Sequence, residues 1–245
     1  MKFLVPLSYS FFYVIVLVVN YLSNALPLNG KTTGELSDLY NSMITPAGVA
    51  FSIWGFIYLL LLIFLVQVWI NYSSKTSNFK DEYRGLLPFF IINAVFNITW
   101  LLAWHYELIY LSFGIMLGLL ISLVYIYRFV KNKNLWLLPW SVYLGWISVA
   151  TIVNASVVLI QIDFSILSSN QELFTALMAF IALCLGSIFM FKEDNIVYPL
   201  VLSWAIYWIA HENRRIEWLY YYLFGLVLIL LMSILLKSYH SYKTK

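Results

Sequence analysis

The chain has 245 residues, of which 63% are hydrophobic and only 10% charged, and its mean hydropathy is +0.86. Soluble domains contain roughly 45–50% apolar and about 25% charged residues, so this composition excludes a soluble globular fold. The net charge is only +3, and the basic residues stand in short clusters between apolar runs, which excludes a nucleic-acid-binding surface.

Eight apolar runs follow one another along the chain. A bilayer core of about 30 Å needs about 20 residues of helix, and backbone groups left unpaired in lipid cost several kcal/mol each. Each run is therefore predicted to be a transmembrane helix, and the seventh is the shortest. The fold class is all-α, a membrane protein with about eight transmembrane helices, over residues 4–22, 48–70, 87–104, 108–130, 135–161, 172–191, 196–211 and 217–237.

The basic residues predict the orientation of these helices. Eleven of the fourteen lysines and arginines lie at the two termini or in alternate linkers that share one side with them. Because cytoplasmic loops carry the excess of Lys and Arg, both termini are predicted to lie in the cytoplasm, with the protein in the cell membrane. The first run is too long for the apolar core of a signal peptide and is kept as a span.

The apolar runs contain few ionisable or nucleophilic side chains. No Asp, Glu, Lys or Arg stands near the centre of a run, which argues against a proton-driven transporter. His105 and Glu107 lie at run ends, where solvated side chains are expected. The single cysteine, Cys184, lies inside a run and is expected to be a small buried hydrophobe, so neither a disulfide nor a thiolate metal site is predicted. No catalytic residue is predicted.

Amides and aromatic rings recur at helical spacing. In the third run, two amides and two indoles share one stripe, formed by Asn93, Asn97, Trp100 and Trp104 at i, i+4, i+7 and i+11. Trp54 and Tyr58 are one turn apart in the second run, and in the fifth run Tyr143 and Asn154 share a face with Trp146 beside it. An amide that faced lipid would stay unpaired, so the stripes should point inward. They serve either as interhelical hydrogen bonds or as a pocket for a flat, apolar ligand.

Small residues repeat every four positions in the fourth run, at Gly114, Gly118 and Ser122. Such a stripe flattens one face of a helix and lets another helix approach closely. We favour a contact within the molecule, and a homodimer through these residues is the alternative.

Three motifs stand in order along the first five runs. Residues 45–58 read Thr-Pro-Ala-Gly-Val-Ala-Phe-Ser-Ile-Trp-Gly-Phe-Ile-Tyr, and they resemble the second-helix signature of the TspO/MBR family, the tryptophan-rich sensory proteins or translocator proteins. Asn97-Ile-Thr-Trp100 is similar to its third-helix Asn-x-x-Trp, and Leu138-Pro139 with the later Asn154 is similar to its fifth helix. The resemblance covers roughly residues 4–161.

This chain also departs from the family pattern. One proline, Pro46, remains of a pair, and Gly48 stands where the family usually has a Trp. Asn93 replaces a usual Gln, and Asn154 falls about a turn later than expected. Because the last three runs have no counterpart in five-helix members, we expect a TspO-like five-helix bundle over residues 1–161 and a three-helix C-terminal extension over residues 162–245.

The resemblance implies a cavity that binds tetrapyrroles or cholesterol-like molecules, closed by the loop after the first helix. By position, the ligand-binding candidates are Pro46, Trp54, Tyr58, Asn97 and Trp100, followed by Trp146 and Asn154, and Asn93 joins them through the stripe that it shares with Asn97.

The function expected from these features is that of a membrane sensor or binding protein whose partners are the bilayer and a hydrophobic small molecule. No cofactor is required, and a porphyrin, haem or sterol-like molecule would be the ligand. The alternative is a permease component for a small apolar or amphipathic solute. A third hypothesis is an enzyme that degrades a bound porphyrin oxidatively, with Trp54 or Trp100 as the redox-active ring.

Overall fold

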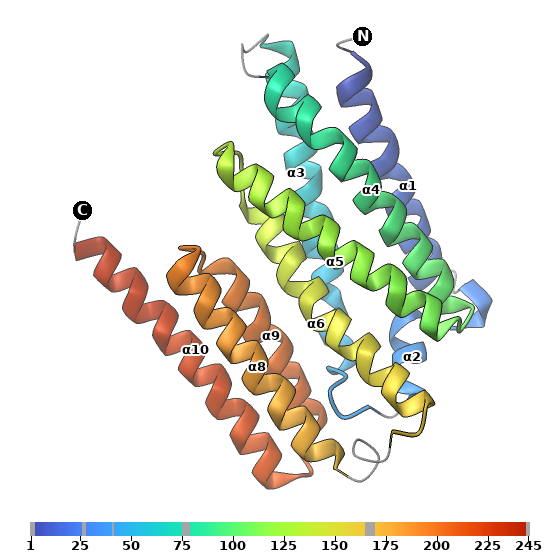
Figure 1. Ribbon diagram of the computed structural model, residues 1–245, viewed down its shortest axis with the longest axis vertical. Coiled ribbons are helices and arrows are strands. Elements are labelled where there is room, and N and C mark those ends of the chain that lie inside the picture. Colours follow the sequence, from blue (N-terminus) through green and yellow to red (C-terminus); the bar gives the residue numbers. More distant parts are fainter. Residues whose placement is uncertain (1–2, 26–27, 41, 75–78, 165–169, 244–245) are drawn as a thin grey trace. The chain divides into compact units, whose positions relative to one another are not determined.

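The computed structural model describes residues 3–25, 28–40, 42–74, 79–164 and 170–243, and this part of the chain is helical, without a strand. The helices are α1 (Leu4–Asn24), η1 (Leu28–Gly30), α2 (Thr33–Asp38), η2 (Gly48–Ser52), α3 (Ile53–Ser73), α4 (Phe79–His105), α5 (Ile109–Asn132), α6 (Leu138–Gln161), α8 (Gln171–Lys192), α9 (Val197–Glu212) and α10 (Glu217–Lys243). The α-helices are labelled in Figure 1.

Every predicted apolar run overlaps one of the long helices, which confirms the all-α membrane fold. The helices α4 and α10 extend beyond their runs, to Phe79 and Lys243, because hydropathy marks only the apolar part of a helix. Among the described residues, seven helices are long and apolar enough to cross a bilayer. The exception is α9, whose 16 residues span only about 24 Å.

The long linker predicted between the first two spans contains short helices. The start of α2 is a capping box, in which the Thr32 N–H donates to the Glu35 carboxylate at 2.7 Å and the Glu35 N–H donates to the Thr32 hydroxyl at 3.2 Å. The bond from the Thr32 backbone, followed by its hydroxyl, lowers the pKa of the exposed Glu35 carboxyl.

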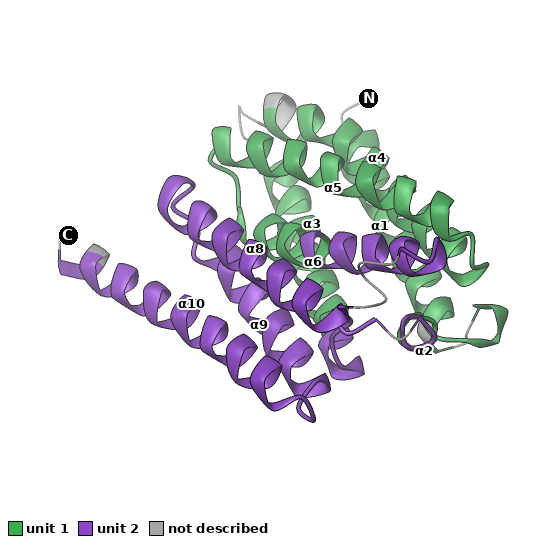
Figure 2. Cartoon of the chain, turned by 60° about the horizontal axis from the view of Figure 1, so that its bottom comes forward, with its two compact units in different colours: residues 1–36, 53–147 green, residues 37–52, 148–245 purple. Residues whose placement is uncertain are grey.

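The chain forms two compact units, shown in different colours in Figure 2. Unit 1 contains residues 1–36 and 53–147, and unit 2 contains residues 37–52 and 148–245. The boundary at residue 147 falls inside α6, and the segment 37–52 is grouped with the C-terminal helices. The family resemblance predicts a boundary between two domains at residue 161. The two compact units do not divide there, and this boundary stays a prediction from the resemblance.

In unit 1, α1 packs on α3 and α4, and α4 packs on α5. A Cβ atom at Gly118 of α5 would lie 2.7 Å from the Phe96 ring of α4, so the glycine allows a close approach of these helices. The Asn93 amide donates to the Ser122 hydroxyl at 2.9 Å across the same contact, whereas no atom lies within 4 Å of a Cβ at Gly114. Gly118 and Ser122 therefore serve the contact between α4 and α5 inside the molecule.

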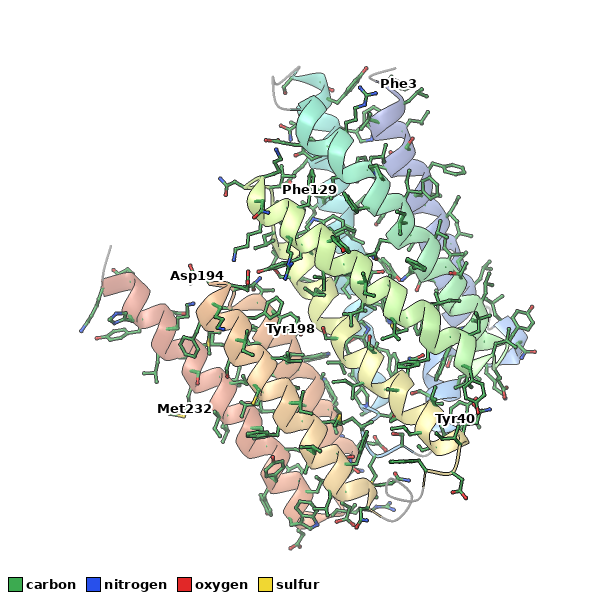
Figure 3. All side chains as sticks on the ribbon, viewed as in Figure 1. Phe3, Tyr40, Phe129, Asp194, Tyr198 and Met232 are labelled. Atoms are coloured by element: carbon green, nitrogen blue, oxygen red, sulfur yellow. The ribbon has the colours of Figure 1, made fainter. Side chains whose placement is uncertain are left out.

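In unit 2, the helices α8, α9 and α10 pack against one another. They approach closely at Gly186 of α8, where a Cβ atom would lie 3.2 Å from Pro199 of α9 and 3.2 Å from Leu230 of α10. Near the turn between α8 and α9, the rings of Phe189 and Tyr198 stack with centroids 3.9 Å apart. Met232 projects from the outer side of α10, as expected of a face in contact with lipid (Figure 3).

Two expectations about single side chains are wrong. His105 is fully buried rather than solvated, and its two ring nitrogens face the carbonyl oxygens of Leu101 and Ser23, at 2.8 and 3.3 Å. Cys184 is exposed on α8 rather than buried. By contrast, Trp104 is buried, as the inward stripe of the third run predicts. Position in the sequence gives the depth of a residue in a span but not the face of the helix on which it lies.

Candidate functional site

The centre of the candidate site in unit 1 is the indole of Trp54, in the first turn of α3. Four other rings surround it, at centroid distances of 5.7 Å for Tyr58, 5.8 Å for Tyr143, 6.3 Å for Trp100 and 6.5 Å for Trp146. Tyr58 and Trp100 are stacked with Trp54, and the other two rings meet it edge to face. We call these five residues, contributed by α3, α4 and α6, the ring cluster. Both arrangements are the ones that aromatic pairs prefer.

A chain of amides borders the ring cluster. The Asn20 amide of α1 donates to the Asn97 side-chain oxygen at 3.0 Å, and the Asn97 amide donates to the Tyr143 hydroxyl at 2.9 Å. All three side chains are buried. Because lipid and protein interior offer no water to replace these bonds, they fix α1, α4 and α6 relative to one another at this depth.

Tyr58 joins the ring cluster to this polar chain. Its buried hydroxyl lies beside the Asn20 and Asn97 side chains but makes no hydrogen bond of good geometry with either amide. The backbone carbonyl of Tyr58 accepts a bond from the Tyr13 hydroxyl at 2.9 Å. A buried hydroxyl whose hydrogen bonds are poorly formed is a place where a ligand acceptor would be favoured.

The ring stack continues from the cluster toward the end of α4. Trp104 stacks on Trp100 with centroids 6.5 Å apart, and its indole N–H donates to the Thr33 carbonyl at 3.4 Å. At the same end, the Asn29 amide donates to the His105 carbonyl at 3.0 Å, and Lys31 forms an exposed ion pair with Glu107 at 2.8 Å. The end of α4 therefore holds residues 28–33 of the linker.

The structure brings together five of the eight predicted site residues, Trp54, Tyr58, Asn97, Trp100 and Trp146. Asn93 bonds to α5 instead, and Pro46 and Asn154 lie in unit 2, so they are not among the side chains that unit 1 assembles. The Asn154 amide donates to the Ala150 carbonyl of its own helix at 3.1 Å. A ligand-binding role of these residues stays a prediction.

Sequence reasoning did not include two residues of this site. Asn20 lies near the end of the first run, and no regular spacing ties it to the stripe in α4. Tyr143 was recognised only as part of a helical face. The signal that could have found Asn20 is the cost of an amide inside an apolar run, because such a residue needs a polar partner on another helix.

The side chains at this site carry aromatic rings, amides and hydroxyls. Among the described residues, no group of three His, Cys, Asp or Glu side chains could hold a metal ion. This set of side chains is suited to a flat, conjugated or fused-ring molecule, which stacking would hold and one or two hydrogen bonds would orient.

The comparisons with known proteins agree with the resemblance of the motifs. A family model described as TSPO-like protein matches residues 6–236, which include the three C-terminal helices as well as the five that resemble the shorter members. No curated protein and no solved structure matches the chain. Because the family model covers nearly the whole chain, this protein belongs to the TSPO-like protein family.

Proposed function

We propose that this protein is a membrane sensor or binding protein that holds a flat, hydrophobic ligand of the tetrapyrrole or sterol class at the ring cluster. The observation that carries the proposal is the position of the Tyr58 hydroxyl, buried beside the cluster without a well-formed hydrogen bond. Five rings supply contact area at a low cost in side-chain entropy, and family membership supports the same class of function.

The polar edge of the cluster indicates what the ligand carries. The Asn97 oxygen already accepts from Asn20, and one Asn97 N–H is used by Tyr143, so Tyr58 is the donor best placed for a new bond. The ligand would then present an acceptor, such as a carbonyl, a carboxylate or a ring nitrogen, next to an otherwise apolar body. This pattern gives orientation through one bond and affinity through stacking.

The test is a titration of the detergent-solubilised protein with protoporphyrin IX and, separately, with cholesterol, followed by tryptophan fluorescence. We expect saturable quenching by one of the two. In Tyr58→Phe, which keeps the ring and removes only the hydroxyl, the dissociation constant should rise about 3–10-fold. Trp54→Phe should remove most of the saturable change. Trp218→Phe, in which an exposed indole is lost, is the matched control and should leave the dissociation constant unchanged.

Quenching that does not saturate, and is equal in the three variants and the wild type, would contradict binding at the ring cluster. In that case the amides and rings serve helix packing, and the permease hypothesis becomes the one to test. Uptake of the same molecules into proteoliposomes separates the two functions, because a binding protein does not accumulate solute inside the vesicle.

We further propose that α9 crosses the bilayer as the seventh of eight spans, with both termini in the cytoplasm. Its 16 residues are short for a span, but α9 packs against both α8 and α10, so most of it meets protein rather than lipid. Reactivity of cysteines introduced at Asp194 and Arg215, which flank α9, toward a membrane-impermeant maleimide in a Cys184→Ser background tests this topology. Labelling of both from the same side of the membrane would contradict it.

A further inference from the structure

Residues 42–50, which precede α3, are bound to the C-terminal helices of unit 2, and we call them the docked segment. At one end, the Met43 N–H donates to the Gln171 side-chain oxygen of α8 at 3.3 Å. The Asn213 amide, at the C-terminal end of α9, donates to the Met43 carbonyl at 2.7 Å. The backbone N–H and the backbone carbonyl of Met43 are therefore both bonded to side chains that lie at least 128 residues away in the sequence.

The other end of the docked segment is bound to α9 in the same manner. The Ala47 N–H donates to the Trp208 carbonyl at 3.3 Å, and the Trp204 indole N–H donates to the Ala50 carbonyl at 3.2 Å. Ala50 has no exposed surface, and Ala47 is also buried. Near the start of the segment, the Ser42 and Ser156 hydroxyls are hydrogen-bonded to each other at 2.8 Å.

Five hydrogen bonds on nine residues are more than a connecting loop at a protein surface needs. Linkers usually satisfy their backbone groups with water, and they tolerate changes in length for that reason. Here the partners belong to α6, α8 and α9 or its C-terminal end, and the side chains of Ile44 and Thr45 are buried, whereas Val49 is exposed. The C-terminal helices thus form a surface whose occupant is the chain's own residues 42–50.

The docked segment leads directly into the helix that carries the ring cluster. The 3₁₀ turn η2 (Gly48–Ser52) ends where α3 begins at Ile53, and Trp54 is four residues after Ala50. A bond that fixes the Ala50 carbonyl therefore restricts the backbone one helical turn before Trp54. A phenylalanine in place of Trp204 would fill most of the same space but could not donate this bond.

We propose that Trp204 is a positioning residue for Trp54. Its indole holds the Ala50 carbonyl and, through the turn η2, sets the start of α3 and with it the orientation of the Trp54 ring. The role of the C-terminal extension is then to hold the docked segment so that the ring cluster keeps its ligand-binding geometry. The part of this proposal that concerns affinity rests on the proposed function, and the part that concerns Trp54 does not.

The test uses ¹⁹F NMR of the full chain labelled with 5-fluorotryptophan, without ligand, with the Trp54 resonance assigned by its loss in Trp54→Phe. In Trp204→Phe the Trp54 resonance should shift by more than its linewidth or broaden. Trp218→Phe removes an indole N–H that is bonded to the Glu172 carboxylate in the same unit, and it should leave the Trp54 resonance in place. An unchanged Trp54 resonance in Trp204→Phe would overturn the proposal.

A second variant keeps the proposal testable if Trp204→Phe does not fold. Asn213→Leu removes the bond to the Met43 carbonyl at the far end of the docked segment, so it should move the Trp54 resonance less than Trp204→Phe would. No shift in Asn213→Leu, in a protein whose amide exchange over residues 42–50 has increased, would show that the docked segment does not act on Trp54.

The affinity for protoporphyrin IX completes the test. We expect the dissociation constant of Trp204→Phe to rise several-fold, with Trp218→Phe equal to the wild type. A shifted Trp54 resonance with unchanged affinity would overturn the role of Trp204 in ligand binding. If the wild type itself shows no saturable binding of this ligand or of cholesterol, the proposed function fails, and the ¹⁹F result alone decides whether Trp204 positions Trp54.

Discussion

The buried tryptophans at the centre of unit 1 and the tryptophans of α9 in unit 2 make different contacts. In unit 1, the indoles of Trp54 and Trp100 are stacked ring against ring. In unit 2, Trp204 and Trp208 meet each other edge to face, and they hold the backbone of the docked segment, one through its indole N–H and the other through its carbonyl. The same residue type thus builds a ring cluster in one unit and an attachment surface in the other.

This difference shows that a count of tryptophans does not locate a binding site. Stacked rings offer faces to a flat ligand, whereas an indole whose N–H is bonded to a buried carbonyl is engaged in holding the chain. The comparison predicts that substitutions in unit 1 act on packing and ligand binding together. Substitution of Trp204 in unit 2 should act first on the docked segment, which its indole holds.

The largest effect is expected for Trp54→Ala. Loss of a buried indole that contacts four rings should lower the free energy of unfolding by about 3–5 kcal/mol, because the surrounding rings cannot fill the space. Unfolding by SDS in mixed micelles measures this change. Trp218→Ala, at an exposed indole, should cost less than about 1 kcal/mol, and equal losses in the two variants would show that the ring cluster is not a packed core.

A smaller effect is expected where α4 and α5 approach closely. In Gly118→Leu the new side chain must displace the Phe96 ring, so the free energy of unfolding should fall by about 1–3 kcal/mol. Gly114→Leu is the matched control, because a Cβ there meets open space, and its effect should stay within about 0.5 kcal/mol. If the two substitutions changed the oligomeric state rather than the stability, the stripe would serve a dimer.

The amide chain should show coupling between its members. Asn20→Ala and Asn97→Ala are each expected to cost about 1–2 kcal/mol, and the double variant should cost less than their sum because both lose the same bond. Thr99→Ala, which removes a hydroxyl bonded within its own helix, serves as the reference and should add independently to Asn97→Ala. Strict additivity for Asn20 and Asn97 would mean that their bond contributes nothing.

The smallest effect concerns the pH dependence of the linker. Because the pKa of Glu35 is lowered in the folded chain, its contribution to the capping box is complete above the ordinary pKa of a glutamate and is lost as the pH falls through the lowered value. The amide ¹H shift of Thr32 should therefore titrate with a midpoint below the ordinary pKa of a glutamate. Glu35→Gln keeps an acceptor and should abolish the titration, and a midpoint above the ordinary value would contradict the cap.

Some features of the fold could be predicted from the amino-acid sequence. The position of each long helix could be predicted, because a run of apolar residues in lipid has no stable alternative to the helix. Helical spacing also placed Asn97 and Trp100 on one inward face, and the motif around Trp54 identified the family. The bond from Asn20 to Asn97 could not be predicted, since which helices become neighbours depends on packing between segments 77 residues apart.

The sequence by itself determined that this is a membrane protein of the TSPO-like family, with aromatic and amide side chains on the inner faces of its helices. Those properties depend on local hydropathy and on spacing within one helix. Only the tertiary structure decided that Tyr58 keeps a buried hydroxyl beside the rings, that His105 is buried, and that residues 42–50 are bound to α8 and α9. Each of these depends on partners from distant segments, and such pairings are fixed by the packing of whole helices and not by the order of residues within one.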